Sequence, residues 1–254
     1  MQNNHAITNS IISLIGSLDT RKGRRKSGLF KAEGTKCVLD TLPHFSLEAV
    51  YATAEWLEDH PELADVATTA TRGDISRMSS LVTAPDVVAV YHIPAEKPIP
   101  SPRGRLMLAL DTIQDPGNLG TIIRVADWFG VTDIIASRET ASCFSPKVVQ
   151  ATMGSIARVA VHYCDLPAEL VRLKEQGAEG VYGTFLDGNN IADVEIAAEG
   201  IIVIGNEGNG ISPQVEREVT HRLLIPSYPA GRPTGESLNA AVATAITLAK
   251  FRGI

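Results

Sequence analysis

The second half of this chain of 254 residues alternates short apolar runs with amphipathic stretches, and this alternation constrains the fold more than any other feature. The apolar runs are rich in Val, Ile and Leu and occupy residues 105–111, 133–137, 157–163, 180–186, 200–205 and 221–226. Between most of them lie helix-like stretches at 118–129, 145–155, 167–176, 212–219 and 237–252. Strands that are apolar on both faces and alternate with helices predict a mostly parallel sheet with helices on both faces, in an α/β fold.

A proline-rich stretch divides the chain. The sequence "IPAEKPIPSPRG" at residues 93–104 is typical of an extended, semi-rigid linker. The region before it begins with a helix-like segment at 5–18 and continues with alternating strand-like and helix-like pieces, which predict a small α/β domain. We therefore expect two domains, at residues 1–98 and 99–254.

Composition excludes several classes of protein. The hydrophobic content of 44% is ample for packed cores, and the three cysteines are far apart without a C-x-x-C pair, so we expect neither a disulfide framework nor a zinc site. The histidines show no ligand spacing, and we expect no metal. No apolar run approaches the roughly 18 residues of a membrane span. These features predict a soluble, cytoplasmic protein that does not bind a membrane.

The charge is unevenly placed. The net charge of −6 argues against indiscriminate nucleic-acid binding, yet residues 21–36, which we expect to form a loop, are strongly basic. Clustered Lys and Arg side chains bind phosphate backbones by releasing counterions. The alternative is an ordinary solvated surface. If the segment binds RNA, the candidate residues are Arg21, Lys22, Arg24, Arg25, Lys26 and Lys31.

The first polar loop with candidate functional residues lies at residues 111–130, after an apolar run. It turns at Asp115 and enters a helix that we expect Asn118 to cap. Arg124 follows Gly120 by one helical turn. Helical side chains lean toward the N-terminus, so Arg124 is expected to extend across the surface that Gly120 leaves bare, toward the loop. The alternative is an arginine that only reaches water.

The second loop, "VIGNEGNGIS" at residues 203–212, is rich in glycine but matches neither the dinucleotide fingerprint nor a Walker loop. A carboxylate at Glu207 a few ångströms from a phosphate would cost several kcal/mol at low effective dielectric. The loop therefore favours a neutral or positive ligand held by backbone amides, or else it is a turn without a ligand. The third loop, within residues 225–246, leads to Ser237, which we expect to cap the last helix.

Together the three loops resemble the three motifs of the SpoU-type RNA 2′-O-ribose methyltransferases of the SPOUT class. The segment "GLFKAEGTKCVLDTL" also looks like the ribosomal-protein-like substrate-binding domain of that family. The residues that match the three motifs are Asn118, Gly120 and Arg124; Gly205, Asn206, Glu207, Gly208 and Gly210; and Ile225, Pro226, Ser237, Leu238 and Asn239.

The resemblance implies a deep trefoil knot at the C-terminal end, S-adenosylmethionine as cofactor, a homodimer, and an RNA substrate, with ribosomal RNA favoured over transfer RNA. Between Ile225 and Ser237 this chain has a longer, proline-rich loop than the usual motif, so the cofactor contacts of residues 227–236 stay open. The cofactor contacts implied by the motifs are Thr184, Gly205, Asn206, Gly210, Ile225 and Leu238.

The implied reaction is displacement of the sulfonium methyl by a ribose 2′-oxygen. In the family the counterpart of Arg124 is regarded as catalytic, often as the base. A guanidinium with a pKa above about 12 rarely loses its proton, so we favour a clamp on a phosphate or on the developing 2′-oxyanion. Glu207 would orient Arg124, the ribose, or only its own loop. The catalytic candidates are Arg124, Asn118, Glu207, Ser237 and Asn239.

Two alternative functions fit the sequence less well. A dinucleotide-dependent oxidoreductase is disfavoured by the late, differently spaced glycines and by Glu207. An RNA-binding or assembly factor that binds the cofactor without catalysis is the second alternative, and the presence of Arg124, Asn118 and Asn239 argues against it.

Overall fold

The computed structural model describes residues 7–229, 235 and 237–254, and it divides the chain into two compact units. The first comprises the residues up to Ala95 together with Ser142–Ala157, and the second comprises Glu96–Ala141 and Arg158–Ile254. The boundary that we expect between residues 98 and 99 stays a prediction. The structure differs from it in one segment, because Ser142–Ala157 groups with the first unit.

The second unit contains a sheet of six parallel strands in the order β10-β8-β9-β5-β6-β7, which confirms the predicted mostly parallel sheet. At its centre β5 pairs with β9 from Leu106 opposite Gly200 to Leu110 opposite Ile204, so these two strands end side by side. The strands are β5 (Leu106–Leu110), β6 (Asp133–Ser137), β7 (Ala160–Cys164), β8 (Val181–Asn190), β9 (Gly200–Ile204) and β10 (His221–Leu224).

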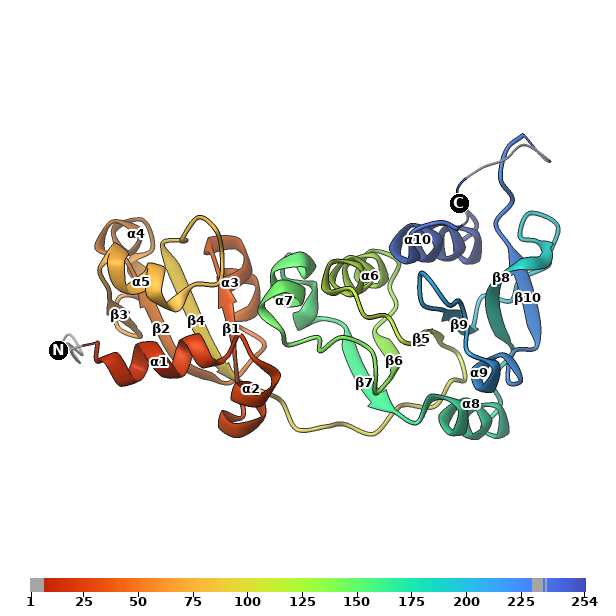
Figure 1. Ribbon diagram of the computed structural model, residues 1–254, viewed down its shortest axis with the longest axis horizontal. Helices are drawn as coiled ribbons and strands as arrows, with labels where there is room; N and C mark the ends of the chain where they lie inside the picture. Colours follow the sequence, from red (N-terminus) through yellow and green to blue (C-terminus); the bar gives the residue numbers. More distant parts are fainter. Residues whose placement is uncertain (1–6, 230–234, 236) are drawn as a thin grey trace. The chain divides into compact units, whose positions relative to one another are not determined.

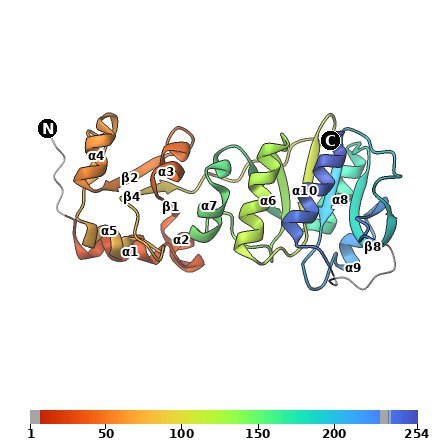
Figure 2. The same ribbon diagram turned by 90° about the horizontal axis from the view of Figure 1, so that it is seen from above.

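Helices cover both faces of this sheet. In both ribbon views α6 and α10 lie side by side on one face, and α8 and α9 lie on the other (Figures 1 and 2). Met107 and Ala109 of β5 pack with Leu170 of α8 in one apolar cluster. Since side chains alternate along a strand, Leu106, Leu108 and Leu110 face the α6 and α10 side. The helices are α6 (Pro116–Trp128), α8 (Leu166–Glu175), α9 (Pro213–Glu216) and α10 (Ala240–Phe251).

Two predicted helix caps are wrong. Helix α6 begins at Pro116 and is capped by Asp115, whose side chain accepts the N–H of Asn118 at 2.8 Å. Helix α10 begins at Ala240 and is capped by Asn239, not by Ser237. Because Asn118 and Ser237 do not cap helices, their side chains are available to other hydrogen-bond partners. The loop that would close the predicted knot contains residues 230–234 and 236, which lie outside the described residues, and the knot stays a prediction.

The first unit is an α/β domain built on a second sheet, of order β1-β4-β2-β3, in which only β2 and β3 pair in parallel. One apolar cluster around Phe30 and Trp56 lies on one face, and another around Ile15 and Ile75 lies on the other. The strands are β1 (Leu29–Glu33), β2 (Leu47–Ala52), β3 (Ala67–Thr69) and β4 (Val87–His92). The helices are α1 (Asn9–Ser17), α2 (Arg21–Ser27), α3 (Thr35–Thr41), α4 (Ala54–Asp59), α5 (Arg72–Met78) and α7 (Pro146–Thr152), with short 3-10 helices at Pro61–Leu63 and Ser155–Ala157.

None of the helices among the described residues is long and apolar enough to cross a membrane.

The basic segment at residues 21–36 is not the predicted loop. Thr20 caps α2 by accepting the N–H of Gly23 at 3.0 Å, and Gly28 ends the helix in the left-handed conformation with φ of 70°. The chain then enters β1, which helices cover on both faces. Alternation along β1 therefore turns Lys31 into the interior, opposite to Phe30. A charged side chain in such a place requires partners.

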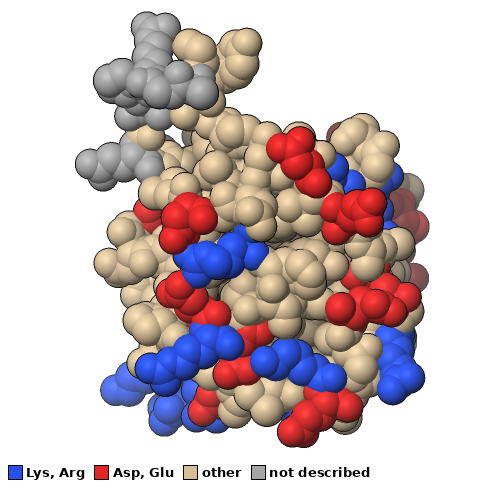
Figure 3. All heavy atoms as spheres, turned by 90° about the vertical axis from the view of Figure 1, so that its right-hand side faces the viewer, with Lys and Arg blue, Asp and Glu red and all other residues tan. Residues whose placement is uncertain are grey.

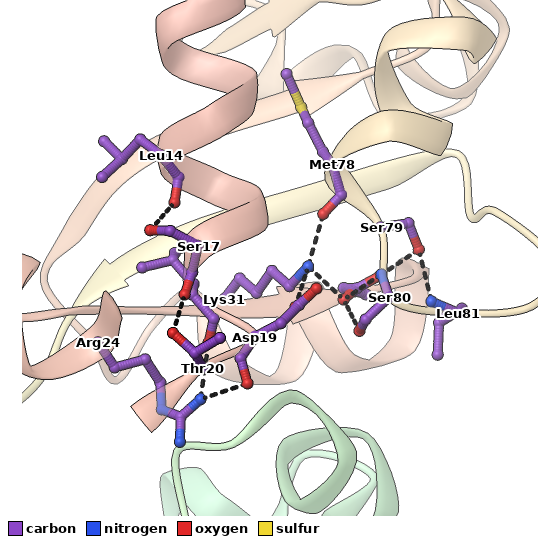
Figure 4. A network of polar contacts seen from close by, with 12 residues as sticks. Leu14, Ser17, Asp19, Thr20, Arg24, Lys31, Met78, Ser79, Ser80 and Leu81 are labelled. Atoms are coloured by element: carbon purple, nitrogen blue, oxygen red, sulfur yellow. Dashed lines mark hydrogen bonds and ion pairs between the residues drawn. The ribbon is translucent and has the colours of Figure 1, made fainter. Parts of the chain in front are cut away.

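Two of the predicted RNA-binding residues, Arg24 and Lys31, are buried, and this corrects their assignment. The Arg24 guanidinium donates to the carbonyl oxygens of Leu18 at 2.7 Å and of Asp19 at 3.2 Å. The Lys31 ammonium pairs with the carboxylates of Asp19 at 2.9 Å and Glu33 at 3.1 Å, and donates to the Met78 carbonyl at 2.6 Å (Figure 4). These contacts join the turn between α1 and α2 to β1 and to the end of α5. Arg24 and Lys31 therefore hold the domain together and do not face RNA.

Lys31→Met is expected to lower the free energy of unfolding of the first unit by about 3 kcal/mol, because it leaves the buried Glu33 carboxylate without its cation. The matched control is Lys36→Met, which removes a surface pair with Asp40 and is expected to cost less than about 1 kcal/mol. Urea titration followed by the fluorescence of the buried Trp56 measures both. Equal effects of the two substitutions would show that the Lys31 network does not stabilise the unit.

Candidate functional site

A cavity of about 540 Å³ lies at the carboxyl edge of the six-stranded sheet, where β9 and β10 end, α10 begins and the middle of β8 adds Thr184, Phe185 and Leu186. This is the edge at which ligands of parallel α/β sheets bind. All six residues predicted as cofactor contacts line the cavity, namely Thr184, Gly205, Asn206, Gly210, Ile225 and Leu238. Two predicted catalytic residues, Glu207 and Ser237, line it as well.

Residues 205–211, the glycine loop, form one wall of the cavity and fold back on themselves. Asn206 and Gly210 pair as an isolated antiparallel bridge, and the Asn206 side-chain oxygen accepts the N–H groups of Gly208 at 2.9 Å and Asn209 at 3.1 Å. A Cβ atom on Gly205 would lie 2.3 Å from the carbonyl carbon of Gly210, so only glycine fits at this close approach. The loop is therefore a compact turn rather than an open phosphate cradle.

Three side chains link the glycine loop to the starts of α6 and α10. The side-chain oxygen of Asn239 accepts the N–H groups of Ala241 at 3.0 Å and Val242 at 3.3 Å, which leaves its amide nitrogen to donate to Asn118 Oδ1 at 2.8 Å. The Asn118 amide nitrogen donates in turn to Glu207 Oε1 at 2.5 Å. The order of donors and acceptors is thus fixed from the α10 cap to Glu207.

Ser237 joins this chain through the backbone, because its hydroxyl donates to the carbonyl oxygen of Glu207 at 3.4 Å. The structure therefore brings together four of the five predicted catalytic residues. Glu207 contacts α6 through Asn118. The Glu207 carboxylate therefore joins the glycine loop to the helix that carries Arg124.

Arg124 stands apart from the other four. It is exposed on α6, one turn after the buried Gly120, and its predicted extension toward the loop stays a prediction. Within the described part of the chain no hydrogen bond or ion pair joins its guanidinium to Asn118, Glu207, Ser237 or Asn239, so the predicted orientation of Arg124 by these residues is not observed.

The cavity has a charged end that the sequence did not reveal. Arg222 of β10 and Glu216 of α9 line it and form an ion pair, and Arg222 also pairs with Asp187 of β8. The Arg222 guanidinium lies 3.6 Å from the ring centroid of Phe185, another lining residue. The hydrogen bond from Arg222 lowers the pKa of the Asp187 carboxyl. No motif marks these residues. Arg222 meets Asp187 because β8 and β10 pair in the sheet, and it meets Glu216 because β10 follows α9 after a short connection.

Among the described residues that line the cavity, the negative charges of Glu207 and Glu216 exceed the single positive charge of Arg222. This balance disfavours a phosphate ligand and suits a ligand with a net positive charge. Figure 3 faces the β8 and β10 side of the second unit and shows acidic and basic side chains mixed across it. The exposed face of α2, in contrast, carries Arg21, Lys22, Arg25 and Lys26.

Comparisons with known proteins cover both units. Residues 105–249 match the SpoU rRNA Methylase family, and residues 9–86 match the MRM3-like substrate binding domain. The chain is 31% identical over 239 residues to the 23S rRNA (guanosine(2553)-2′-O)-methyltransferase RlmP of Bacillus subtilis, with 93% of each chain covered.

Solved structures are similar over nearly the full length. A putative RNA methyltransferase of the TrmH family from Porphyromonas gingivalis is 37% identical, with a TM-score of 0.86 and coverage of 96% of this chain and 98% of that one. An rRNA methyltransferase from Sinorhizobium meliloti with bound AdoMet is 28% identical, with a TM-score of 0.84 and coverage of 98% of this chain and 96% of that one.

Proposed function

We propose that this chain, which belongs to the SpoU rRNA methylase family, transfers a methyl group from S-adenosylmethionine to a ribose 2′-hydroxyl of ribosomal RNA. The observation that carries the proposal is the hydrogen-bonded chain from Asn239 through Asn118 to Glu207, which assembles the three family motifs at one cavity. A relative whose alignment with this chain covers 93% of each protein bears the name of a ribosomal RNA 2′-O-methyltransferase. We place the protein in the cytoplasm, where ribosomal RNA is modified in bacteria such as the source of that relative.

The cavity fits S-adenosylmethionine in size, polarity and charge. Its volume of about 540 Å³ lies within the range of small-molecule sites, and Leu186, Ile225 and Leu238 offer apolar surface to an adenine ring. The excess of acidic residues on its wall suits the positive sulfonium. When bound, the cofactor supplies a methyl group that its own positive charge activates. The residues of this chain bind it and align it.

Arg124 is the residue that we assign to the RNA. Arg124 is exposed on α6, and its fork of N–H groups matches a phosphate or a developing 2′-oxyanion. Asn118, on the first turn of the same helix, is fixed to Glu207, so the helix that carries Arg124 is fastened to the cavity wall. Arg124 acts as a clamp whose positive charge stabilises charge that develops in the transition state.

Arg124→Ala is expected to lower kcat for methyl transfer to ribosomal RNA by about 100- to 1,000-fold, as loss of a charge-stabilising donor does. The Kd for S-adenosylmethionine, measured by calorimetry, should change by less than about twofold, because Arg124 does not line the cavity. Arg124→Lys should not restore activity, since an ammonium lacks the fork. Arg217→Ala, at an exposed arginine that follows α9, serves as the control.

A parallel loss of cofactor binding in Arg124→Ala would overturn the assignment of Arg124 to the RNA. If the unaltered protein binds S-adenosylmethionine but transfers no labelled methyl group to ribosomal or transfer RNA, the chain is an RNA-binding factor without catalysis.

The exposed side of α2 is the proposed contact with the RNA backbone. Arg21, Lys22, Arg25 and Lys26 are exposed on this helix, in the unit that matches a substrate binding domain. Four cations on one short helix attract phosphates without reading sequence.

Replacing Arg25 and Lys26 together by Ala should weaken RNA binding and reduce the slope of log Kd against log salt by about 1.4 to 1.8, the value for two lost phosphate contacts. Lys36→Ala removes a cation that is already paired with Asp40 and should leave the slope unchanged. Filter binding at several salt concentrations measures the slope, and an unaltered slope in the double variant would mean that α2 is only surface.

A homodimer through α6 and α10 is part of the same proposal. The two helices pack together and expose Trp128, Val242 and Ile246, and the Trp128 side chain is 85% exposed. Exposed apolar side chains on two helices that pack together are typical of protein interfaces.

Trp128→Glu is expected to convert the dimer to a monomer in sedimentation experiments at micromolar concentration, because it buries an unpaired charge at the interface. The control, Val171→Glu, places the same charge at an exposed apolar residue of α8 and should leave the dimer intact. A dimer that survives Trp128→Glu would exclude this face as the interface.

A further inference from the structure

The residue that directly follows β5, Asp111, is bonded to both ends of the glycine loop. Its N–H donates to the carbonyl oxygen of Ile204, the last residue of β9, at 2.9 Å. Its Oδ2 accepts the N–H of Ser212, the cap of α9, at 2.7 Å. Since Ile204 precedes the loop and Ser212 follows it, one residue of a neighbouring strand fixes the separation of the two ends.

Thr112 adds a third contact, inside the loop. Its carbonyl oxygen accepts the side-chain N–H of Asn206 at 2.8 Å, and its own N–H donates to the Ser137 hydroxyl at 3.0 Å. Thr112 adopts a φ of 60°, which is rare for a β-branched residue and persists only where the surroundings determine it. The backbone after β5 is thus held in an unfavourable conformation in which it contacts the loop.

Asp111 supports the loop from behind, because it is only 4% exposed and is not among the residues that line the cavity. Its second oxygen, Oδ1, accepts the Thr112 hydroxyl at 3.1 Å, so both carboxyl oxygens have a donor. A carboxyl group in this place cannot serve as a contact for a ligand. Its hydrogen bonds all serve to set the shape of the backbone around it.

We propose that Asp111 is a positioning residue that holds the glycine loop in its cofactor-binding shape before the cofactor arrives. The inference rests on the proposed function, in that it takes the cavity to bind S-adenosylmethionine. A loop that is already ordered loses less conformational freedom when the ligand binds, so the ligand binds more tightly. Cofactor affinity therefore depends on a residue that does not touch the cofactor.

Two substitutions at Asp111 test the proposal by calorimetry with S-adenosylmethionine. Asp111→Ala removes the acceptor of the partly buried Ser212 N–H and should raise Kd by about tenfold or more. Asp111→Asn should keep Kd within about threefold of the unaltered protein, because its amide oxygen still accepts from Ser212 and its amide nitrogen donates to the Thr112 hydroxyl instead. In methyl-transfer assays Asp111→Ala should raise KM for the cofactor and leave kcat at saturation within about threefold.

The matched control is Asp165→Ala. Asp165 follows β7 as Asp111 follows β5, and it accepts the N–H of Ala168 at 3.3 Å, but it does not line the cavity or contact the glycine loop. This variant should lose some stability as a helix cap does, with the Kd for the cofactor unchanged.

An unchanged Kd in Asp111→Ala would overturn the proposal. Equal weakening by Ala and Asn would also overturn it, because the negative charge and not the hydrogen bonds would then be responsible. Should Asp111→Ala fail to fold, hydrogen exchange of the unaltered protein without cofactor decides: the Ser212 amide should exchange as slowly as the amides of β9, and exchange at the rate of an exposed loop would contradict the proposal. An unaltered protein that binds no S-adenosylmethionine would refute the proposed function instead, which separates the two failures.

Discussion

The parallel pairing of β5 with β9 is the constraint on which the rest of the site depends. It places Leu110 opposite Ile204, so the segments that follow these strands start side by side although they are distant in the sequence. Asp111 then reaches the glycine loop, and Asn118 on α6 reaches Glu207 within it. If a third strand lay between β5 and β9, neither of these contacts could form at hydrogen-bonding distance.

The sequence predicts the parts of the structure that follow from local pattern. The six short apolar runs rich in Val, Ile and Leu correspond to the six strands of the second unit, because strands covered by helices on both faces carry few polar side chains. The predicted cofactor residues line one cavity for a related reason, since loops that follow parallel strands gather at one edge of the sheet. The contact of Gly205 with Gly210 is likewise anticipated by glycine at both positions.

What the sequence does not reveal depends on tertiary contacts. Arg24 and Lys31 belong to a basic run whose composition predicts RNA binding. However, helices cover β1 on both faces, and Asp19 and Glu33 form ion pairs with the buried Lys31. Buried charge is tolerated when it is paired, and the pairing partners come from other elements. The contact of Arg222 with Asp187 is hidden from sequence analysis in the same way, because the pairing of β8 with β10 brings these two residues together. From the sequence we expect Asn118 and Ser237 to cap α6 and α10, whereas Asp115 and Asn239 cap them, because the choice between neighbouring polar residues depends on the backbone angles of the helix ends.

Analysis of the methylated nucleosides tests the central claim most directly. Ribosomal RNA from a strain that lacks this protein is incubated with the purified protein and S-adenosylmethionine, digested to nucleosides and analysed by mass spectrometry. We predict the appearance of one kind of 2′-O-methylated nucleoside, dependent on Arg124. Methylation of a base, or a cofactor that binds without any methylated ribose being formed, would contradict it.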